Sequence, residues 1–258
     1  MMMNVLKKAL LLTLGLTPLA ISGQAQETTD SVKLTRKKLY MGAGMDMAYF
    51  STTLTETKTG GKYLSPLRFH TYAFNLSFNF NYDITNSVGL FTGINLKNIG
   101  FIQKYSVVDS TVKRRVLTLG VPLGIKVGNL SRHVFGFAGG GVDVPFNYRE
   151  KGFRRRGNKD KFNEWFSERT PAIMPYVFAG VCLKPGITLK AQYYTTNFLN
   201  TSFTETVTLP GTQTTYITSP YSNYTKLNLL LLSVGFDLRY SKKSKAEPVS
   251  AEPAMRTM

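Results

Sequence analysis

The chain between residues 39 and 240 repeats one pattern, in which large apolar residues alternate with small or polar ones. The clearest stretch is residues 72–83, YAFNLSFNFNYD, where Tyr, Phe and Leu occupy every second position. Alternation over this length predicts a β-strand with one apolar and one polar face. We expect eight such strands, at about 39–50, 69–83, 88–101, 116–127, 133–148, 173–183, 187–196 and 227–240.

Two of these strands carry finer predictions about which residues share a face. In the first, the apolar face continues through Met47 and Tyr49. In the fifth, the apolar phase changes from Phe137 to Val142 across a run of three glycines, Gly139–Gly141. Such a change of phase at glycine predicts a β-bulge.

The connections between the predicted strands alternate in length. Short links with turn-forming residues lie at 84–87, 128–132 and 184–186, and long ones at about 51–68, 102–115, 149–170 and 197–226. Short turns at one end and long loops at the other are typical of outer-membrane β-barrels. The pattern therefore predicts an all-β, eight-stranded antiparallel up-and-down transmembrane β-barrel. Within the third long loop, NKDKFNEWFSER predicts a short amphipathic helix.

A soluble lipocalin-like barrel has the same alternation with its apolar face inside, so the polar face must distinguish the two. That face consists mainly of Gly, Asn, Ser and Thr, as at Gly42, Asn75, Ser77 and Gly120, with few charges. Small residues fit the narrow lumen of an eight-stranded barrel, whereas a water-facing sheet usually carries Lys and Glu. We therefore expect the apolar face to contact lipid. Aromatic residues near the strand ends are candidates for interfacial girdles: Tyr49, Phe50, Tyr72, Tyr82, Tyr148 and Tyr240.

The chain ends and the composition indicate export. Residues 1–25 have the charged start, apolar centre and small-residue cleavage site of a signal peptide. We expect a periplasmic segment at 26–38, the barrel at 39–240 and a disordered periplasmic tail at 241–258. Cys182 is the only cysteine, so no disulfide forms within the chain. In an exported protein, the net charge of +17 favours an anionic membrane surface over nucleic acid as partner.

The last predicted strand contains Ser233-Val-Gly-Phe-Asp-Leu-Arg-Tyr240. This segment resembles the C-terminal assembly signal of outer-membrane proteins, with Gly235, Phe236, Leu238 and Tyr240 at the motif positions. Together with YDITNSVGLFTGINLKNIGF and LTLGVPLGIKVG, the chain resembles the small porin-like outer-membrane β-barrel family abundant in Bacteroidetes, over residues 39–240. The resemblance implies residence in the bacterial outer membrane and recognition by the barrel-assembly machinery.

Charged residues at predicted lumen positions form the first candidate site. Lys126, Lys190, Asp237 and Arg239 are expected in one layer near the periplasmic end, with Lys190 and Asp237 paired. Such a cluster either satisfies buried charge as a structural plug or acts as a selectivity filter. The plug is the simpler interpretation.

Basic residues in the long loops form the second candidate site. Arg114, Arg115, Arg154, Arg155 and Arg156 are candidates for binding the phosphates of lipopolysaccharide, because the guanidinium group makes bidentate contacts to phosphate. A basic loop that is simply solvated is the alternative.

Support for catalysis is thin. No nucleophile motif, metal-ligand spacing or phosphate-binding loop occurs, and His70 and His133 are expected at opposite ends of the barrel. We therefore expect a monomeric, non-enzymatic barrel without cofactor or metal, in contact with outer-membrane lipid and lipopolysaccharide. The alternatives are a narrow porin that passes small solutes, and a lipid-modifying hydrolase that uses His70.

Overall fold

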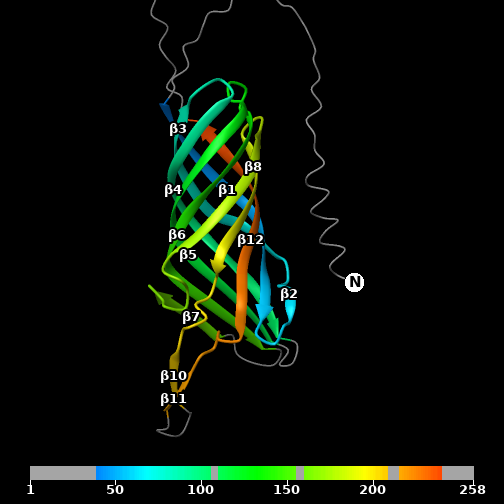
Figure 1. The fold of residues 1–258 in the computed structure, drawn as a ribbon, viewed down its shortest axis with the longest axis vertical. Helices are drawn as coiled ribbons and strands as arrows, with labels where there is room; N and C mark the ends of the chain where they lie inside the picture. The colour runs from blue at the N-terminus through cyan, green and yellow to red at the C-terminus, as the bar shows by residue number, and fades with distance from the viewer. Residues whose placement is uncertain (1–38, 106–109, 155–159, 209–214, 240–258) are drawn as a thin grey trace, which may run out of the picture. The chain divides into compact units, whose positions relative to one another are not determined.

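The computed structural model describes residues 39–105, 110–154, 160–208 and 215–239. These residues form twelve strands (Figure 1). The strands are β1 (Leu39–Thr57), β2 (Lys62–Leu64), β3 (Arg68–Asp83), β4 (Val88–Tyr105), β5 (Ser110–Asn129), β6 (Val134–Arg154), β7 (Asp160–Trp165), β8 (Met174–Leu183), β9 (Ile187–Asn197), β10 (Glu205–Thr208), β11 (Thr215–Thr218) and β12 (Tyr224–Arg239). The predicted signal peptide (1–25), the segment 26–38 and the tail 241–258 lie outside the described residues.

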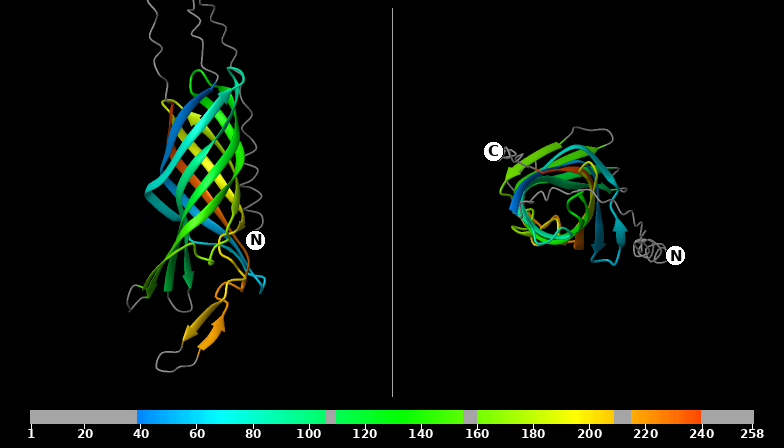
Figure 2. Two further views of the ribbon diagram at one scale, coloured as in Figure 1. Left: turned by 90° about the vertical axis from the view of Figure 1, so that its left-hand side faces the viewer. Right: turned by 90° about the horizontal axis from the view of Figure 1, so that it is seen from above.

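Ten of the strands share one sheet, and this sheet closes on itself because β12 pairs with both β9 and β1. The short strands β2 and β7 are attached to β1 and β6, so eight strands complete the ring seen end-on in Figure 2. Every pairing is antiparallel, and, apart from the closing pair of β12 and β1, the eight strands that neighbour each other in the ring are consecutive ring strands along the chain. The prediction of an eight-stranded up-and-down barrel is confirmed. Separately, β10 and β11 form a small hairpin.

The outer surface of the ring is apolar, as predicted. On β3, Phe78, Phe80 and Tyr82 are exposed, whereas the intervening Asn81 is 1 % exposed. On β5, the outward-facing apolar residues run from Leu117 to Val127. Ten residue steps at a tilt near 40° span about 25 Å, the height of the apolar belt of outer-membrane barrels. The lipocalin-like alternative, with this face inside, is wrong.

A closed ring leaves no strand edge without a partner, which is the condition for placing β-structure in lipid. Together with the apolar belt, it is the architecture of a bacterial outer-membrane protein. The short turns after β3, β5 and β8 and the described chain ends all lie at one end, which we call the turn end, and the longer connections lie at the other, the loop end (Figure 1). In outer-membrane barrels the turn end is periplasmic and the loop end extracellular.

Two irregularities in register correct the predicted strand faces. The register of β1 with both neighbours shifts between Asp46 and Ala48, so that Tyr49 points into the lumen and is 1 % exposed. On β6 the register with β5 shifts at Phe146, and Tyr148 is buried in the same way. Neither tyrosine belongs to an aromatic girdle. The predicted girdle residues Phe50 and Tyr82 are exposed, while the Tyr72 side chain and Tyr240 lie outside the described residues.

The bulge predicted at Gly139–Gly141 does not occur. The register of β5 with β6 is continuous from Thr118 and Pro145 to the turn, and Phe137 faces the lumen rather than lipid. A Cβ on Gly139 would lie 2.8 Å from the ring of Phe178, and one on Gly141 would lie 2.5 Å from the Tyr176 hydroxyl. These glycines therefore leave room for aromatic side chains of the neighbouring strand β8.

At the loop end, the long loops of the prediction are largely strand. β1, β4, β5 and β6 continue past the predicted ends of their strands, and β7 pairs with β6 at residues 160–165, where the sequence predicted a helix. That prediction is wrong because these residues are extended and pair with β6. Asn163 and Trp165 therefore lie on one face of the strand, and Phe162 and Glu164 on the other. Among the described residues, no helix is long and apolar enough to cross a membrane.

Candidate functional site

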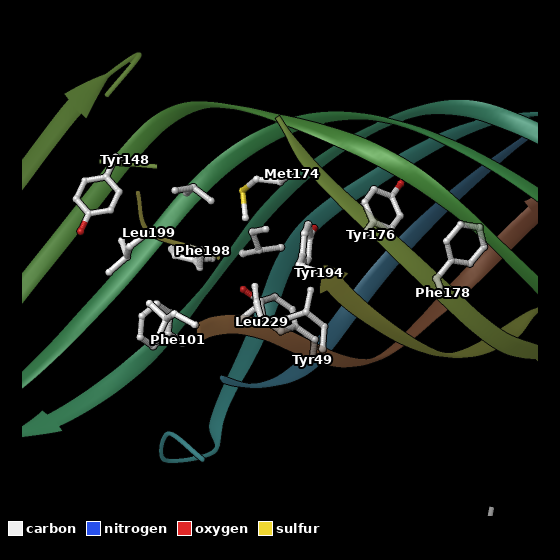
Figure 3. Close-up of a cluster of buried hydrophobic side chains, with 14 of the residues drawn as sticks. Tyr49, Phe101, Tyr148, Met174, Tyr176, Phe178, Tyr194, Phe198, Leu199 and Leu229 are labelled. Carbon is white, nitrogen blue, oxygen red and sulfur yellow. The ribbon is translucent and has the colours of Figure 1, made fainter. Parts of the chain in front are cut away.

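The half of the lumen nearer the loop end is filled by a cluster of large apolar side chains, which we call the apolar plug (Figure 3). Eleven of its residues are no more than 1 % exposed: Tyr49, Ile99, Phe101, Val116, Tyr148, Met174, Tyr194, Phe198, Leu199, Leu227 and Leu229. Phe198 and Leu199 follow the end of β9, where a hydrogen bond from the Phe198 amide to the Leu227 carbonyl (2.8 Å) turns the chain inward. The Phe198 ring meets Phe101 edge to face at 5.2 Å.

The sequence did not predict this plug, because the alternation indicated small and polar residues along the lumen face of the strands. One signal was present. Residues 229–232 are four consecutive leucines, and apolar residues on both faces of a strand indicate a strand covered on both sides. Leu229 and Leu231 lie in the plug, and Leu232 faces outward.

Next to the plug, Lys97 and Asp143 form a buried ion pair, with Nζ 3.0 Å from Oδ1 and side chains 4 % and 0 % exposed. The Asp143 carboxylate also accepts hydrogen bonds from the Tyr194 hydroxyl (2.5 Å) and Thr118 Oγ1 (3.4 Å). The Lys97 ammonium lies 3.8 Å from the centre of the Tyr176 ring. Such complete partnering is what allows a charge pair to stay buried.

The predicted pairing of Lys190 with Asp237 is wrong. Lys190 Nζ lies 3.0 Å from Asp46 Oδ2 instead, and Asp237 Oδ2 lies 3.3 Å from His133 Nε2. The prediction assumed that residues equally far from the ends of neighbouring strands lie at the same height in the barrel. The register instead places Lys190 opposite Ser233. Asp237 is four residues further along β12, or about 13 Å away.

Three of the four predicted lumen charges nevertheless line one cavity of about 90 Å³ on the turn-end side of the plug: Lys126, Lys190 and Asp237. Lys126 also donates a hydrogen bond to the side chain of Asn81. The side chain of Arg239 lies outside the described residues. Tyr176 and Phe178, which belong to the plug, also line the cavity, so the packed plug borders it.

At the loop end, five basic residues gather on the outer face of β5, β6 and β7: Lys113, Arg115, Arg149, Lys151 and Lys161. We call them the basic patch. Their register places like charges opposite each other, with Lys113 beside Lys151, Arg115 beside Arg149, and Lys151 beside Lys161. Like charges directly opposite on a sheet are destabilising. The patch therefore concentrates positive charge on one face at the loop end.

Glu150 and Glu164, two acidic residues of β6 and β7 whose side chains the structure describes, lie on the other face. Glu150 pairs with Arg114, and Glu164 contacts Ser167 and Arg169. In the patch itself, the Arg149 guanidinium donates to the amide oxygens of Asn163 (2.8 Å) and Asn147 (3.1 Å). Neutral acceptors hold this side chain in place without neutralising its charge.

Arg114 does not fit its predicted role in lipopolysaccharide binding. It is 5 % exposed, points into the barrel, and donates to Glu150 Oε2 (3.1 Å) and Gln103 Oε1 (2.6 Å). Arg115, the next residue on the strand, points outward as part of the basic patch. The side chain of Arg154, and Arg155 and Arg156 entirely, lie outside the described residues.

Arg169 contacts residues of another connection at the loop end. Arg169 precedes β8 and pairs with Glu205 at the base of the β10–β11 hairpin, and it donates to the Tyr221 hydroxyl at 3.2 Å. Burial lowers the pKa of Arg169, but the hydrogen bonds with Tyr221 and Glu205 outweigh burial, and the pKa is raised above its ordinary value. The residue thus links the connection before β8 to the connection between β9 and β12.

The predicted assembly signal lies on β12 at the closing seam of the barrel. Gly235 faces inward, where a Cβ would lie 2.4 Å from the Met45 carbonyl oxygen, while Phe236 and Leu238 face outward. Tyr240 lies outside the described residues. The alternation of the motif matches the strand, and recognition by the assembly machinery stays a prediction.

The two histidines lie at opposite ends of the barrel, His70 on β3 near the loop end and His133 in the turn before β6. His70 is buried, stacks on Tyr49 with ring centres 4.1 Å apart, and lies 3.5 Å from Ser51 Oγ. A rim hydrolase needs an accessible serine, but Ser51 is 0 % exposed. This geometry does not favour the hydrolase alternative.

No protein-family model and no curated protein matches the chain. Among solved structures, it is similar to the attachment invasion locus protein of Yersinia pestis (11 % identity, 78 % of this chain and 100 % of that one, TM-score 0.34). It is also similar to Neisserial surface protein A (12 %, 79 % and 98 %, TM-score 0.38) and to the N-terminal β-barrel domain of Pseudomonas aeruginosa OprF (11 %, 76 % and 99 %, TM-score 0.23). These scores are low, and the assignment as a closed barrel rests on the strand pairing described above.

Proposed function

We propose that this protein is a non-enzymatic, monomeric outer-membrane barrel that binds phosphate groups of lipopolysaccharide through its basic patch. The observation that carries the proposal is the register of β5, β6 and β7, which brings five bases onto one outward face. Phosphate bridging between like charges removes the repulsion that the register creates.

The position of the patch along the barrel supports this partner. Arg115 is the next outward residue after Leu117, where the apolar belt of β5 ends. On the neighbouring pair of strands, β6 and β7, Trp165 lies opposite Asn147 and is exposed. Tryptophan favours the membrane–water interface, so the patch lies at the height of lipid head groups on the extracellular side.

The apolar plug favours a binding protein over the alternative of a narrow porin. Solute would have to displace side chains that are no more than 1 % exposed, and packed interiors have few voids large enough for water. We expect the wild-type protein to give no single-channel conductance in planar bilayers. Regular openings would favour the porin.

The direct test compares two triple variants in vesicles containing lipopolysaccharide. Arg115→Gln, Arg149→Gln and Lys151→Gln remove three charges from the patch. Each basic residue near an anionic membrane surface contributes about 1 kcal/mol. The loss is therefore about 3 kcal/mol, or on the order of a hundred-fold in affinity for lipopolysaccharide.

The matched control removes the same charge at the loop end outside the patch, with Lys58→Gln, Lys62→Gln and Lys226→Gln. Lys62 pairs with Glu56, and Lys226 lies opposite the same residue, so Lys62 and Lys226 are near a carboxylate. The control should keep wild-type affinity. An equal loss in both variants would show that net charge alone decides binding, and no loss in either would refute the proposal.

A further inference from the structure

Three side chains with metal-binding atoms meet at the turn end of the lumen. His133 lies in the turn between β5 and β6, Cys182 near the end of β8, and Asp237 near the end of β12. One ligand atom from each, an imidazole nitrogen, a thiol sulfur and a carboxylate oxygen, lies within 4.8 Å of the others. The residues are far apart along the chain, and the pairing of β6 with β8, β8 with β9 and β9 with β12 brings them together. Their spacing along the chain therefore does not predict a metal site.

The distances fit a single small ion. In a tetrahedral zinc site with Zn–N and Zn–O bonds near 2.0 Å, the N and O ligands lie about 3.3 Å apart, and the sulfur is slightly more distant. His133 Nε2 and Asp237 Oδ2 lie 3.3 Å apart. Small side-chain adjustments are therefore enough to place the three atoms on one ion.

The environment of His133 suits a metal ligand. Its Nε2 atom is buried and makes no hydrogen bond, although it is at ion-pair distance from Asp237. A buried polar atom without a hydrogen bond is costly and needs an explanation. The residue also has a φ of +58°, which is uncommon outside glycine. The fold thus holds the imidazole with its buried nitrogen beside the Asp237 carboxylate but without a hydrogen bond.

The surroundings fix two of the ligands and leave a path for the ion. Cys182 is 0 % exposed and packs with Leu130 and Phe135. The backbone amide of Asp237 donates to the Gly186 carbonyl at 2.8 Å, which ties β12 to the turn after β8. The side chains of His133 and Asp237 are 18 % and 13 % exposed, and Asp237 also lines the lumen cavity. An ion can therefore enter from the periplasmic side.

We propose that His133, Cys182 and Asp237 form a three-ligand site for Zn²⁺ at the periplasmic mouth of the barrel. A thiolate with an imidazole and one carboxylate selects a late transition metal, because Ca²⁺ and Mg²⁺ require oxygen ligands. Three protein ligands leave the fourth position to water. Bound zinc joins the β5–β6 turn, β8 and β12, and so fastens the turn end next to the seam where β12 meets β1. This site is independent of the basic patch.

Cobalt spectroscopy on the full-length protein in detergent tests the site. Co²⁺ is the probe, because thiolate ligation gives a charge-transfer band in the near ultraviolet. Cys182 is the only cysteine of the chain, so this band in the wild-type protein can come only from Cys182. We expect one Co²⁺ per chain, the thiolate band, and displacement of both by Zn²⁺. Absence of the band in folded wild-type protein overturns the proposal, whatever the total amount of bound metal.

Variants assign the other two ligands. Cys182→Ser should abolish the band. His133→Ala and Asp237→Asn should each weaken the affinity for Co²⁺ by more than about 100-fold, because loss of a residue that only supports a ligand already costs about 10–100-fold. His70→Ala at the opposite end is the matched control and should bind like wild type. The shift in gel mobility on boiling shows that each variant is folded. If both variants bind Co²⁺ as tightly as the wild type does, the thiol binds metal without help from His133 or Asp237. That result would overturn the proposed site.

Discussion

The buried ion pair of Lys97 and Asp143 allows a quantitative prediction, because the same lumen contains a second pair that is better hydrated. Lys97→Met keeps most of the side-chain volume but removes the ammonium group. Asp143 then loses hydrogen bonds of 3.0 and 3.1 Å from Nζ. Its side chain is 0 % exposed, so the carboxylate stays uncompensated except for Tyr194 and Thr118.

Breaking a buried ion pair at one partner costs about 3–5 kcal/mol, and we expect a loss near the lower end because two hydroxyl donors remain. The comparison is Lys190→Met, which breaks the pair with Asp46. Those side chains are 23 % and 13 % exposed and line the lumen cavity. Water can replace the lost ammonium there, so the expected cost is about 1 kcal/mol, as for exposed pairs.

The assay is urea-dependent folding in lipid vesicles, followed by the gel mobility of unboiled samples. Lys97→Met should lower the free energy of unfolding by at least about 2 kcal/mol more than Lys190→Met does. The double variant Lys97→Met, Asp143→Leu should recover much of the loss, because it removes the buried charge altogether. Equal losses in the two single variants, or the reverse order, would refute the reasoning that burial sets the cost.

Three further predictions concern single positions. Gly120→Ala should destabilise the barrel by about 1–3 kcal/mol, because its Cβ would lie 1.9 Å from Asp143 Oδ1, whereas Gly136→Ala, with its nearest atom at 3.8 Å, should be nearly neutral in the same urea assay. Arg169→Gln should release the β10–β11 hairpin and speed its cleavage by added protease, and an unchanged cleavage rate would contradict a linking role. Trp165 is the only tryptophan, and its fluorescence should be quenched by lipids brominated near the head group more than by lipids brominated at the chain end. Equal quenching would move it away from the interface.

Most of the architecture was predictable from the sequence, because a β-strand has a period of two. The alternation in residues 72–83 identified the strand, and the small residues on its polar face, such as Asn79 and Asn81, identified the lumen side. The alternation of short and long connections indicated the ring. Each of these inferences depends only on neighbours along the chain. For that reason they required no knowledge of which strands pair.

What failed depended on one-residue shifts or on distant contacts. A shift of register at Asp46 turned Tyr49 from the lipid side to the lumen, since a single extra residue exchanges the two faces of a strand. The same kind of shift at Phe146 buried Tyr148. Arg114 was assigned to a loop because the sequence does not mark where a strand stops at the membrane surface and where it continues beyond it.

The sequence by itself determined that this chain forms a membrane barrel and which residues share each face of most strands. Only the tertiary structure decided which side chains meet inside, because the relative heights of strands depend on their stagger around the ring. Asp143 next to Lys97, Asp46 next to Lys190, and His133 close to Cys182 and Asp237 are consequences of that stagger. The basic patch has the same origin, since it exists only where the register places Lys113 beside Lys151 and Arg115 beside Arg149.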